Sequence, residues 1–187
     1  MSLIALVQEK LKHHPNRFNH ILGVKERALE LQAIYGGDAF ALETAAILHD
    51  LFKYDSISEQ TQWIKDEQEV LKYQSVPVAY HAIAAAYYAK DALKIDDPIV
   101  FEAIYYHIWG KVGMRLETMI ICVADFCEKN RTFHGAKTVY ELSKKDLQQA
   151  FILSLEYTIE YLNEGGLTPF YEQLDVLKYY KETAWNY

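Results

Sequence analysis

Hydrophobic residues recur along most of the chain at the three- and four-residue spacing of an amphipathic helix, and no stretch alternates as a strand would. With glycines and prolines as breaks, the spacing predicts the helices 3–11, 17–35, 38–48, 59–73, 77–90, 97–108, 114–126, 143–163 and a last one from 168. Asp38 and Ser58 stand where an N-cap is expected. Segment 38–48 is apolar on most faces, so we expect it to lie near the centre.

Glycine and proline are scarce, with 8 and 4 residues, which argues against the many turns of an all-β fold. No repeat, low-complexity tract or linker divides the sequence. We therefore predict an all-α protein, a single-domain helical bundle over residues 1–187. A domain of this size buries roughly 70% of the surface that its unfolded chain exposes, so its core is sizeable.

Charge and cysteine content limit which binding partners and which cellular compartment we expect for this protein. The net charge of −7 leaves no electrostatic footprint for duplex nucleic acid. No apolar run is long enough to span a membrane, and the apolar segment 3–7 is too short for a signal peptide. Cys122 and Cys127 are expected on different faces of one helix as free thiols, which favours the cytoplasm. The 15 tyrosines suit either the core or the interface of a homodimer.

Two polar features stand out from this helical background. His49-Asp50 follows the segment that we expect to be central, but an ordinary polar pair at a helix end explains it equally well. Asp125 lies in the most apolar predicted helix, where an unpaired carboxylate costs several kcal/mol or takes up a proton. It therefore needs a partner, which is either a metal ion or a cation such as Arg131 or Lys53.

Four of the seven histidines fall on separate predicted helices: His20, His49, His81 and His107. Each alone is more often a structural histidine than a ligand. Together with Asp50 and Asp125 they offer enough nitrogen and oxygen donors for two metal ions, and this donor chemistry suits iron, manganese or zinc. The other three, His13, His14 and His134, are interpreted as surface or loop residues.

Basic residues close to these motifs are candidates for holding phosphate groups: Arg17, Lys53, Lys111 and Arg131. For Lys111 we favour a solvated ion pair. Cys122 lies one turn before Asp125, where it could approach a metal, although packing in the core is the favoured role.

Five segments in this order resemble the HD superfamily of metal-dependent phosphohydrolases, and most closely its YqeK-type family, the symmetrical diadenosine tetraphosphate hydrolases of bacteria. The segments are R-F-N-H-I-L-G-V (17–24), A-I-L-H-D-L-F-K (46–53), H-A-I-A-A-A (81–86), Y-H-I-W-G-K-V-G-M (106–114) and A-D-F-C-E-K-N-R (124–131). They cover about residues 17–131, the expected core of the metal site.

The resemblance implies a helical bundle of the HD-domain type with two metal ions, usually iron. By position, His20, His49, Asp50 and Asp125 would bind one ion. His81 and His107 would bind the other, with Asp50 bridging. The implied reaction is the cleavage of diadenosine tetraphosphate into two ADP by a metal-activated water.

The resemblance also implies roles for the basic side chains near the metal ligands. Lys53, Arg17 and Arg131 would hold phosphates. Lys53 and Arg131 would also join Asp50 in catalysis, by offsetting the charge on the phosphoryl oxygens.

The sequence departs from the family pattern in two places. A hydroxyl residue usually follows the fourth histidine, and here Ile108-Trp109 stands instead, so we predict that Trp109 stacks on a base of the substrate. Glu128 is followed by Lys129 rather than proline. These departures leave open another nucleotide substrate, such as a nucleoside monophosphate or a cyclic dinucleotide. A non-catalytic binding or regulatory module and a metal-free structural domain are the remaining alternatives.

Overall fold

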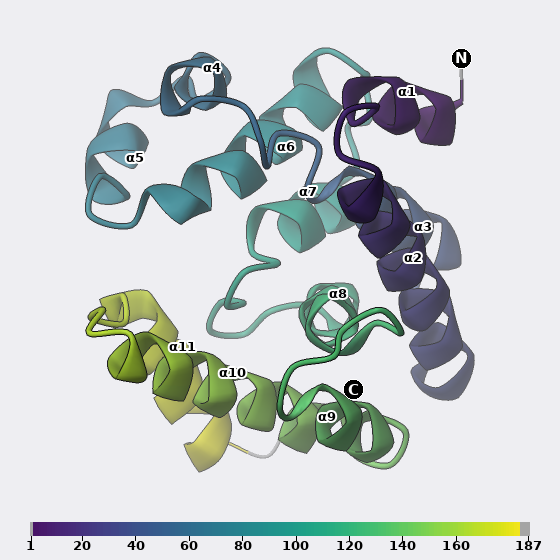
Figure 1. The fold of residues 1–187 in the computed structure, drawn as a ribbon, viewed down its shortest axis with the longest axis vertical. Helices are drawn as coiled ribbons and strands as arrows, with labels where there is room; N and C mark the ends of the chain where they lie inside the picture. Colours follow the sequence, from purple (N-terminus) through teal and green to yellow (C-terminus); the bar gives the residue numbers. More distant parts are fainter. Residues whose placement is uncertain (1, 184–187) are drawn as a thin grey trace.

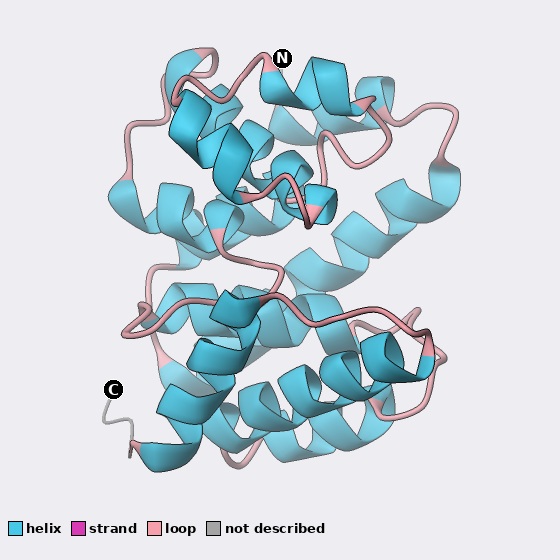
Figure 2. Ribbon diagram, turned by 90° about the vertical axis from the view of Figure 1, so that its left-hand side faces the viewer, coloured by secondary structure: helices cyan, strands magenta, loops and turns pink. Residues whose placement is uncertain are grey.

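Helices make up the regular structure of residues 2–183, the part of the chain that this computed structural model describes (Figure 2). The first group is α1 (Leu3–Lys10), α2 (Pro15–Tyr35), α3 (Ala39–Leu48), α4 (Ile57–Thr61), α5 (Glu67–Lys72), the 3₁₀ turn η1 (Pro77–Ala79), α6 (Tyr80–Asp91) and α7 (Pro98–Tyr105). The second is α8 (Leu116–Cys127), α9 (Ala136–Ser143), α10 (Leu147–Glu164) and α11 (Tyr171–Glu182). The all-α prediction is thereby confirmed.

Helix α8 connects helices α1–α7 with helices α9–α11. In Figure 1, α1 and α4–α7 lie above it, α2 and α3 lie to its right, and α9–α11 lie below it. It packs against α2, α3 and α7 on one side and against α9 and α10 on the other. Nearly all of its residues are buried, because its apolar side chains face both groups. Helix α3 is also buried along most of its length, as its sequence predicted.

Polar caps fix where several helices begin. The Asp38 carboxylate accepts a hydrogen bond from the backbone N–H of Ala41 at 2.9 Å, which satisfies an otherwise unpaired donor at the start of α3. The predicted cap at Ser58 is wrong, because the side chain of Ser56 accepts the bond from the backbone of Glu59 in a capping box. The earlier start gives α3 and α4 a short connection that contains Lys53.

The structure differs from the predicted helices in several places. The single helix expected over 59–73 is divided, since Asp66 caps a separate α5. Helix α9 was missed because its eight residues follow the loop around Gly135 and show only a short amphipathic pattern. Helix α7 ends at Tyr105 rather than near residue 108, so His107 lies in the turn that follows it. Pro77 begins a 3₁₀ turn before the helix proper.

Among residues 2–183, none of the helices is both long enough and apolar enough to cross a membrane. Cys122 and Cys127 are both buried free thiols, as the sequence predicted.

Candidate metal centre

The six predicted metal ligands come together from five places in the chain. His20 lies on α2, His49 caps the C-terminus of α3, and Asp50 follows it directly. The remaining three are His81 in the first turn of α6, His107 in the turn after α7, and Asp125 on α8. The histidines and Asp50 are buried. The short helix α3 and the tight turn after it place His49 and Asp50 at the centre of the group. The packing of α2, α6, α7 and α8 brings the other four ligands to them.

One set of donors surrounds the Oδ2 side of Asp50. Nε2 of His20 lies 3.5 Å and Nε2 of His49 lies 3.4 Å from this oxygen. Oδ1 of Asp125 closes the group, at 3.0 Å from Nε2 of His20 and 4.0 Å from Nε2 of His49. Two imidazole nitrogens and two carboxylates thus face one point.

A second set surrounds the other oxygen of the same carboxylate. Oδ1 of Asp50 lies 3.1 Å from Nε2 of His81 and 3.9 Å from Nε2 of His107. These two imidazole nitrogens are 3.3 Å apart. Asp50 therefore faces both sets, one with each oxygen.

The opposite ring nitrogens are held by other groups. Nδ1 of His49 and Nδ1 of His107 each lie 2.8 Å from a backbone carbonyl, of Ala46 and Ile104 respectively. A carbonyl only accepts, so each Nδ1 donates, and in the neutral imidazole each Nε2 then carries a lone pair toward the centre. Such outer contacts fix the tautomer and ring orientation of histidine ligands.

Three of the central atoms are buried and make no hydrogen bond of good geometry within residues 2–183: Nε2 of His20, Nε2 of His49 and Oδ1 of Asp50. Buried polar atoms without partners are rare, because leaving them unsatisfied costs free energy. The six predicted ligands form three groups of three donors, and within each group the ligand atoms lie within 4.8 Å of one another. The donor atoms therefore fit a site for two metal ions that share Asp50.

Charge and burial set the protonation of these groups. Burial would raise the pKa of Asp50, but the neighbouring His49, His81 and Lys53 outweigh it and hold the pKa of this carboxyl well below its usual range. Burial, together with the nearby His49 and His81, lowers the pKa of His107 to about 3. Burial would lower the pKa of His49, but the adjacent Asp50 outweighs it and raises that pKa. Ionised carboxylate and neutral imidazole are the forms that bind metals, so a metal at His49 competes with a proton.

Three of the predicted basic residues lie beside this centre. Arg17 donates to Oδ2 of Asp50 at 2.6 Å, and Nζ of Lys53 lies 3.7 Å from Oδ1 of the same residue. Arg131 donates to Oδ1 of Asp125 at 2.9 Å and to its backbone carbonyl at 3.1 Å. Asp125 thus has the ion pair with Arg131 that was one sequence alternative, and it faces the histidines as well.

Two other predicted residues lie away from the centre. Trp109 is buried, with 6% of its surface exposed, and its ring packs 5.6 Å from Phe170 and 6.3 Å from Tyr73. The structure therefore does not place it where a base would stack. Lys111 forms the ion pair that we favoured for it, with Glu102 at 3.2 Å.

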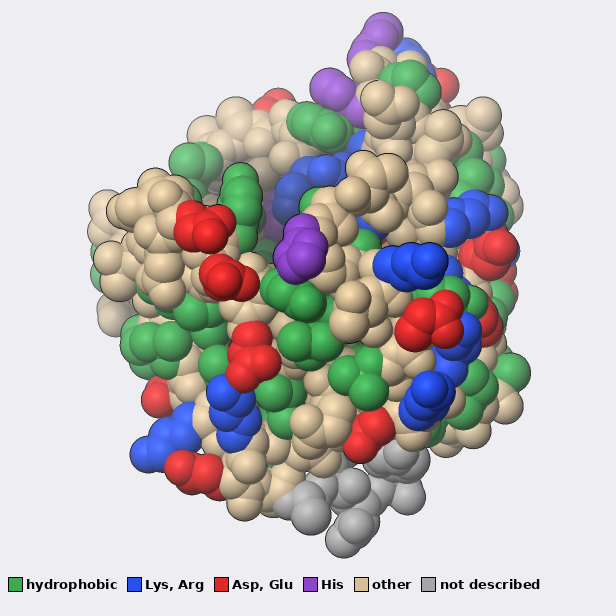
Figure 3. Space-filling view, turned by 60° about the horizontal axis from the view of Figure 1, so that its bottom comes forward, with side chains coloured by type: hydrophobic (Ala, Val, Ile, Leu, Met, Phe, Trp, Pro, Cys, Tyr) green, Lys and Arg blue, Asp and Glu red, His purple; other side chains and the backbone are tan. Residues whose placement is uncertain are grey.

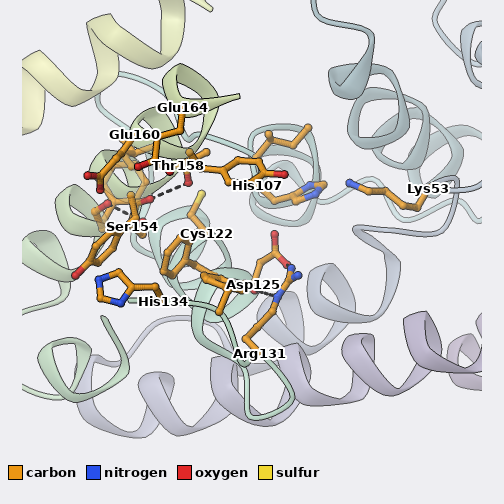
Figure 4. Close-up of a pocket in the computed structure, with 17 residues that line it drawn as sticks. Lys53, His107, Cys122, Asp125, Arg131, His134, Ser154, Thr158, Glu160 and Glu164 are labelled. Atoms are coloured by element: carbon orange, nitrogen blue, oxygen red, sulfur yellow. Dashed lines mark hydrogen bonds and ion pairs between the residues drawn. The ribbon is translucent and has the colours of Figure 1, made fainter. Parts of the chain in front are cut away.

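A cavity of about 850 Å³ opens beside the donors (Figure 3). Figure 4 shows Lys53, His107, Asp125 and Arg131 toward one end and side chains of α10 toward the other. Cys122 lines it between the two ends, and burial raises the pKa of its thiol, so it stays protonated. The volume is within the usual range for a small-molecule site.

Glu128 and Gly23 are site residues that sequence reasoning missed. Oε1 of Glu128 lies 3.2 Å from Nδ1 of His20, and this glutamate is only 2% exposed. A methyl group at Gly23 would overlap the Glu128 carboxylate, so only glycine leaves room for it. Glu128 lies near Asp125 in the sequence. Because it follows the end of α8, helical periodicity could not predict where its side chain points.

Comparisons with known proteins agree with this geometry. Residues 17–130 match the family described as HD domain. The chain is 37% identical over 162 residues to a protein of Halalkalibacterium halodurans named "Bis(5'-nucleosyl)-tetraphosphatase, symmetrical", covering 85% of this chain and 84% of that one. A protein of the same name from Bacillus subtilis is 36% identical over 162 residues, covering 85% of each chain.

A solved structure gives the same result for the fold. A crystal structure from Clostridium acetobutylicum, described as a predicted HD superfamily hydrolase involved in NAD metabolism, superposes with a TM-score of 0.88 at 26% identity. The match covers 96% of this chain and 95% of that one. This chain belongs to the HD domain family, together with the relatives named symmetrical bis(5'-nucleosyl)-tetraphosphatase.

Proposed function

We propose that this protein hydrolyses diadenosine tetraphosphate to two ADP. The observation that carries the proposal is Asp50, which faces one set of imidazole donors with each oxygen and has Arg17 and Lys53 beside it. A shared carboxylate between two metal sites, next to cations, is the arrangement that phosphoanhydride hydrolysis uses. The names of the relatives supply the substrate.

Two metal ions are the implied cofactor. His20, His49, Asp50 and Asp125 would hold one, and His81 and His107, with Asp50 again, would hold the other. When bound, such ions act as Lewis acids and make water a nucleophile near neutral pH. The donor set suits iron, manganese or zinc, and iron is the metal that we expect from the family resemblance.

The chain's own residues would bind and orient the polyphosphate. In symmetrical cleavage, the oxygen of water forms a bond to one of the two central phosphorus atoms. The bridging oxygen leaves with the other ADP, and the two protons of the water pass to the new terminal phosphates or to the solvent. Lys53 and Arg131 lie at the cavity end next to the donors, where they would offset the charge that develops on the phosphoryl oxygens. Arg17 donates a hydrogen bond to the Asp50 carboxylate and has further N–H groups for phosphate.

The test combines metal content with product analysis. The protein is purified without added metal, then assayed for bound iron, manganese and zinc and for ADP release from diadenosine tetraphosphate. About two metal ions per chain, with ADP as the sole product, is the expected result. A panel of nucleoside monophosphates and cyclic dinucleotides separates this reaction from the other HD reactions. Turnover of one of these, with none of diadenosine tetraphosphate, would replace the proposed substrate.

Compartment and assembly are further proposals. The two free thiols favour a reducing cytoplasm. A homodimer stays a prediction, which light scattering coupled to gel filtration would test directly.

A further inference from the structure

The two ends of the 850 Å³ cavity differ in charge. Lys53, Arg131 and Asp125 line the end that adjoins the metal donors, where the two cations outnumber the one carboxylate. Glu160 and Glu164, on the last turns of α10, line the far end (Figure 4). The space-filling view in Figure 3 shows basic side chains inside a hollow and acidic ones near its rim. A polyphosphate is attracted to the basic end and repelled from the acidic one.

The wall that α10 contributes presents hydrogen-bond acceptors. The hydroxyl of Ser154 donates to the carbonyl of Phe151 at 2.7 Å, and that of Thr158 donates to the carbonyl of Ser154 at 2.8 Å. Because each hydroxyl hydrogen is used within the helix, only oxygen lone pairs remain for a ligand. The neighbouring carboxylates of Glu160 and Glu164 are acceptors too. These acceptors favour a ligand that brings hydrogen-bond donors to this end.

Aromatic rings line the same half of the cavity. The Phe126 ring packs against Phe133 at 4.9 Å and runs nearly parallel to Tyr157 at 6.2 Å between centroids. His134 packs edge-on against Tyr157 at 5.5 Å. A Cβ on Gly135 would lie 2.5 Å from Cε2 of Tyr157, so the backbone before α9 packs directly against this ring. Flat aromatic faces of this kind stack on nucleobases with little regard to sequence.

We propose that the α10 end of the cavity binds the nucleoside part of the nucleotide substrate, which makes Tyr157, Thr158, Glu160 and Glu164 determinants of affinity. The base stacks on the aromatic wall. The ribose hydroxyls and any exocyclic amino group donate to the acceptors of α10. The phosphates then extend toward Lys53 and Arg131. This inference rests on the proposed function for its substrate, but the binding step can be measured without turnover.

The experiment uses the metal-loaded full chain and three variants: Tyr157→Leu, Thr158→Val, and Glu160→Gln combined with Glu164→Gln. Glu156→Gln is the matched control, because Glu156 lies on the same helix but pairs with Lys181 at 2.5 Å. Calorimetry measures ADP binding, and steady-state kinetics measures KM and kcat for diadenosine tetraphosphate. Inorganic tripolyphosphate, which has no nucleoside, serves as a competitive inhibitor that probes only the phosphate end.

We expect Tyr157→Leu to weaken ADP binding and raise KM about ten-fold, and Thr158→Val about three-fold. The double glutamine variant should also weaken ADP binding, while kcat, metal content and the tripolyphosphate inhibition constant stay within about two-fold. The control should match the wild type. Tighter ADP binding in the double variant would instead mark this end as a phosphate site and overturn the inference.

The two proposals fail in different ways. If the wild type binds ADP but does not cleave diadenosine tetraphosphate, the proposed function fails, and the ADP affinities of the variants still decide the nucleoside site. If the wild type cleaves the substrate and all α10 variants bind ADP as it does, the nucleoside site alone is wrong. Absence of ADP binding by the wild type also overturns it.

Discussion

Nδ1 of His20 and Oε1 of Glu128 lie 3.2 Å apart, so the imidazole donates to a buried carboxylate and aims its Nε2 at the donor cluster. The second oxygen of Glu128 accepts from the backbone N–H of Asn130 at 2.7 Å and from its side chain at 2.9 Å. Both carboxylate oxygens of Glu128 are therefore held in place, and Glu128 in turn fixes the ring orientation of His20, a predicted metal ligand. A carboxylate behind a histidine ligand orients it and raises its basicity.

Replacing Glu128 with glutamine should lower metal affinity about 10- to 100-fold, because the buried negative charge behind His20 is lost. Competition with a chelator would measure the affinity, and circular dichroism would check the fold. Glu26→Gln is the control, since Glu26 is an exposed partner of Lys129. Metal affinity equal to that of the wild type would mean that Glu128 only tethers the loop after α8.

Gly23→Ala tests the same contact from the other side. The added methyl group would overlap the Glu128 carboxylate, so Glu128 must shift away from His20. Alanine favours a helix interior by about 1 kcal/mol over glycine, so α2 itself is not weakened. We expect a loss of metal affinity similar to that of Glu128→Gln.

The two changes act through one contact, so combining Gly23→Ala with Glu128→Gln should cost little more than either alone. The same chelator competition on the single and double variants gives this coupling. Fully additive losses would show that the glycine acts elsewhere.

Much of the candidate metal site could be predicted because its donor residues lie in short ordered segments with distinctive residue types. His49-Asp50 and Asp125 were readable from their positions after or within apolar helices. That these residues meet at one site was expected only from the resemblance to the HD superfamily. Helical periodicity indicates which face of a helix is buried but not which helices pack together.

Other parts of the site depend on contacts that leave no local pattern. The role of Glu128 comes from the path of the chain after α8, and that of Gly23 from a neighbour more than a hundred residues away in sequence. His134, interpreted as a loop residue, is exposed as expected but also lines the cavity. Its loop precedes α9, the helix that periodicity missed because it is short.

Asp50→Ala should remove both metal ions and reduce ADP release by at least about 10³-fold, because one carboxylate serves both donor sets. Elemental analysis and the turnover assay would measure the two effects. Asp55→Ala is a matched control, since it loses only an ion pair with Lys10. An Asp50→Ala protein that kept full activity would refute the proposed metal site.

Arg131→Gln should lower kcat/KM about 10²- to 10³-fold while metal content stays close to that of the wild type. The guanidinium holds Asp125 through two hydrogen bonds and borders the cavity, so its loss removes a cation next to the phosphates. Arg131→Lys should recover part of the rate because it restores the charge but not the paired geometry.

Lys129→Gln is the control for Arg131→Gln, because Lys129 is exposed and pairs with Glu26. It should leave kcat/KM unchanged. If Arg131→Gln instead lost its metal with no separate effect on the loaded enzyme, Arg131 would be a positioning residue for Asp125 rather than a phosphate contact.

Trp109→Phe separates stability from substrate binding at the position where the sequence predicted base stacking. Because the indole is buried against Tyr73 and Phe170, its truncation should lower the free energy of unfolding by about 1–3 kcal/mol. KM for diadenosine tetraphosphate should not change. Urea unfolding of the metal-free protein measures the first quantity, and steady-state kinetics measures the second.

Trp63→Phe is the matched control for this prediction, because Trp63 packs against Phe52 and Tyr88 and does not line the cavity. Both variants should lose stability and keep the wild-type KM, since in each case an aromatic contact inside the fold is weakened. A Trp109→Phe protein with unchanged stability and a ten-fold higher KM would restore the stacking role. Such a result would require Trp109 to leave its packing site when the nucleotide binds.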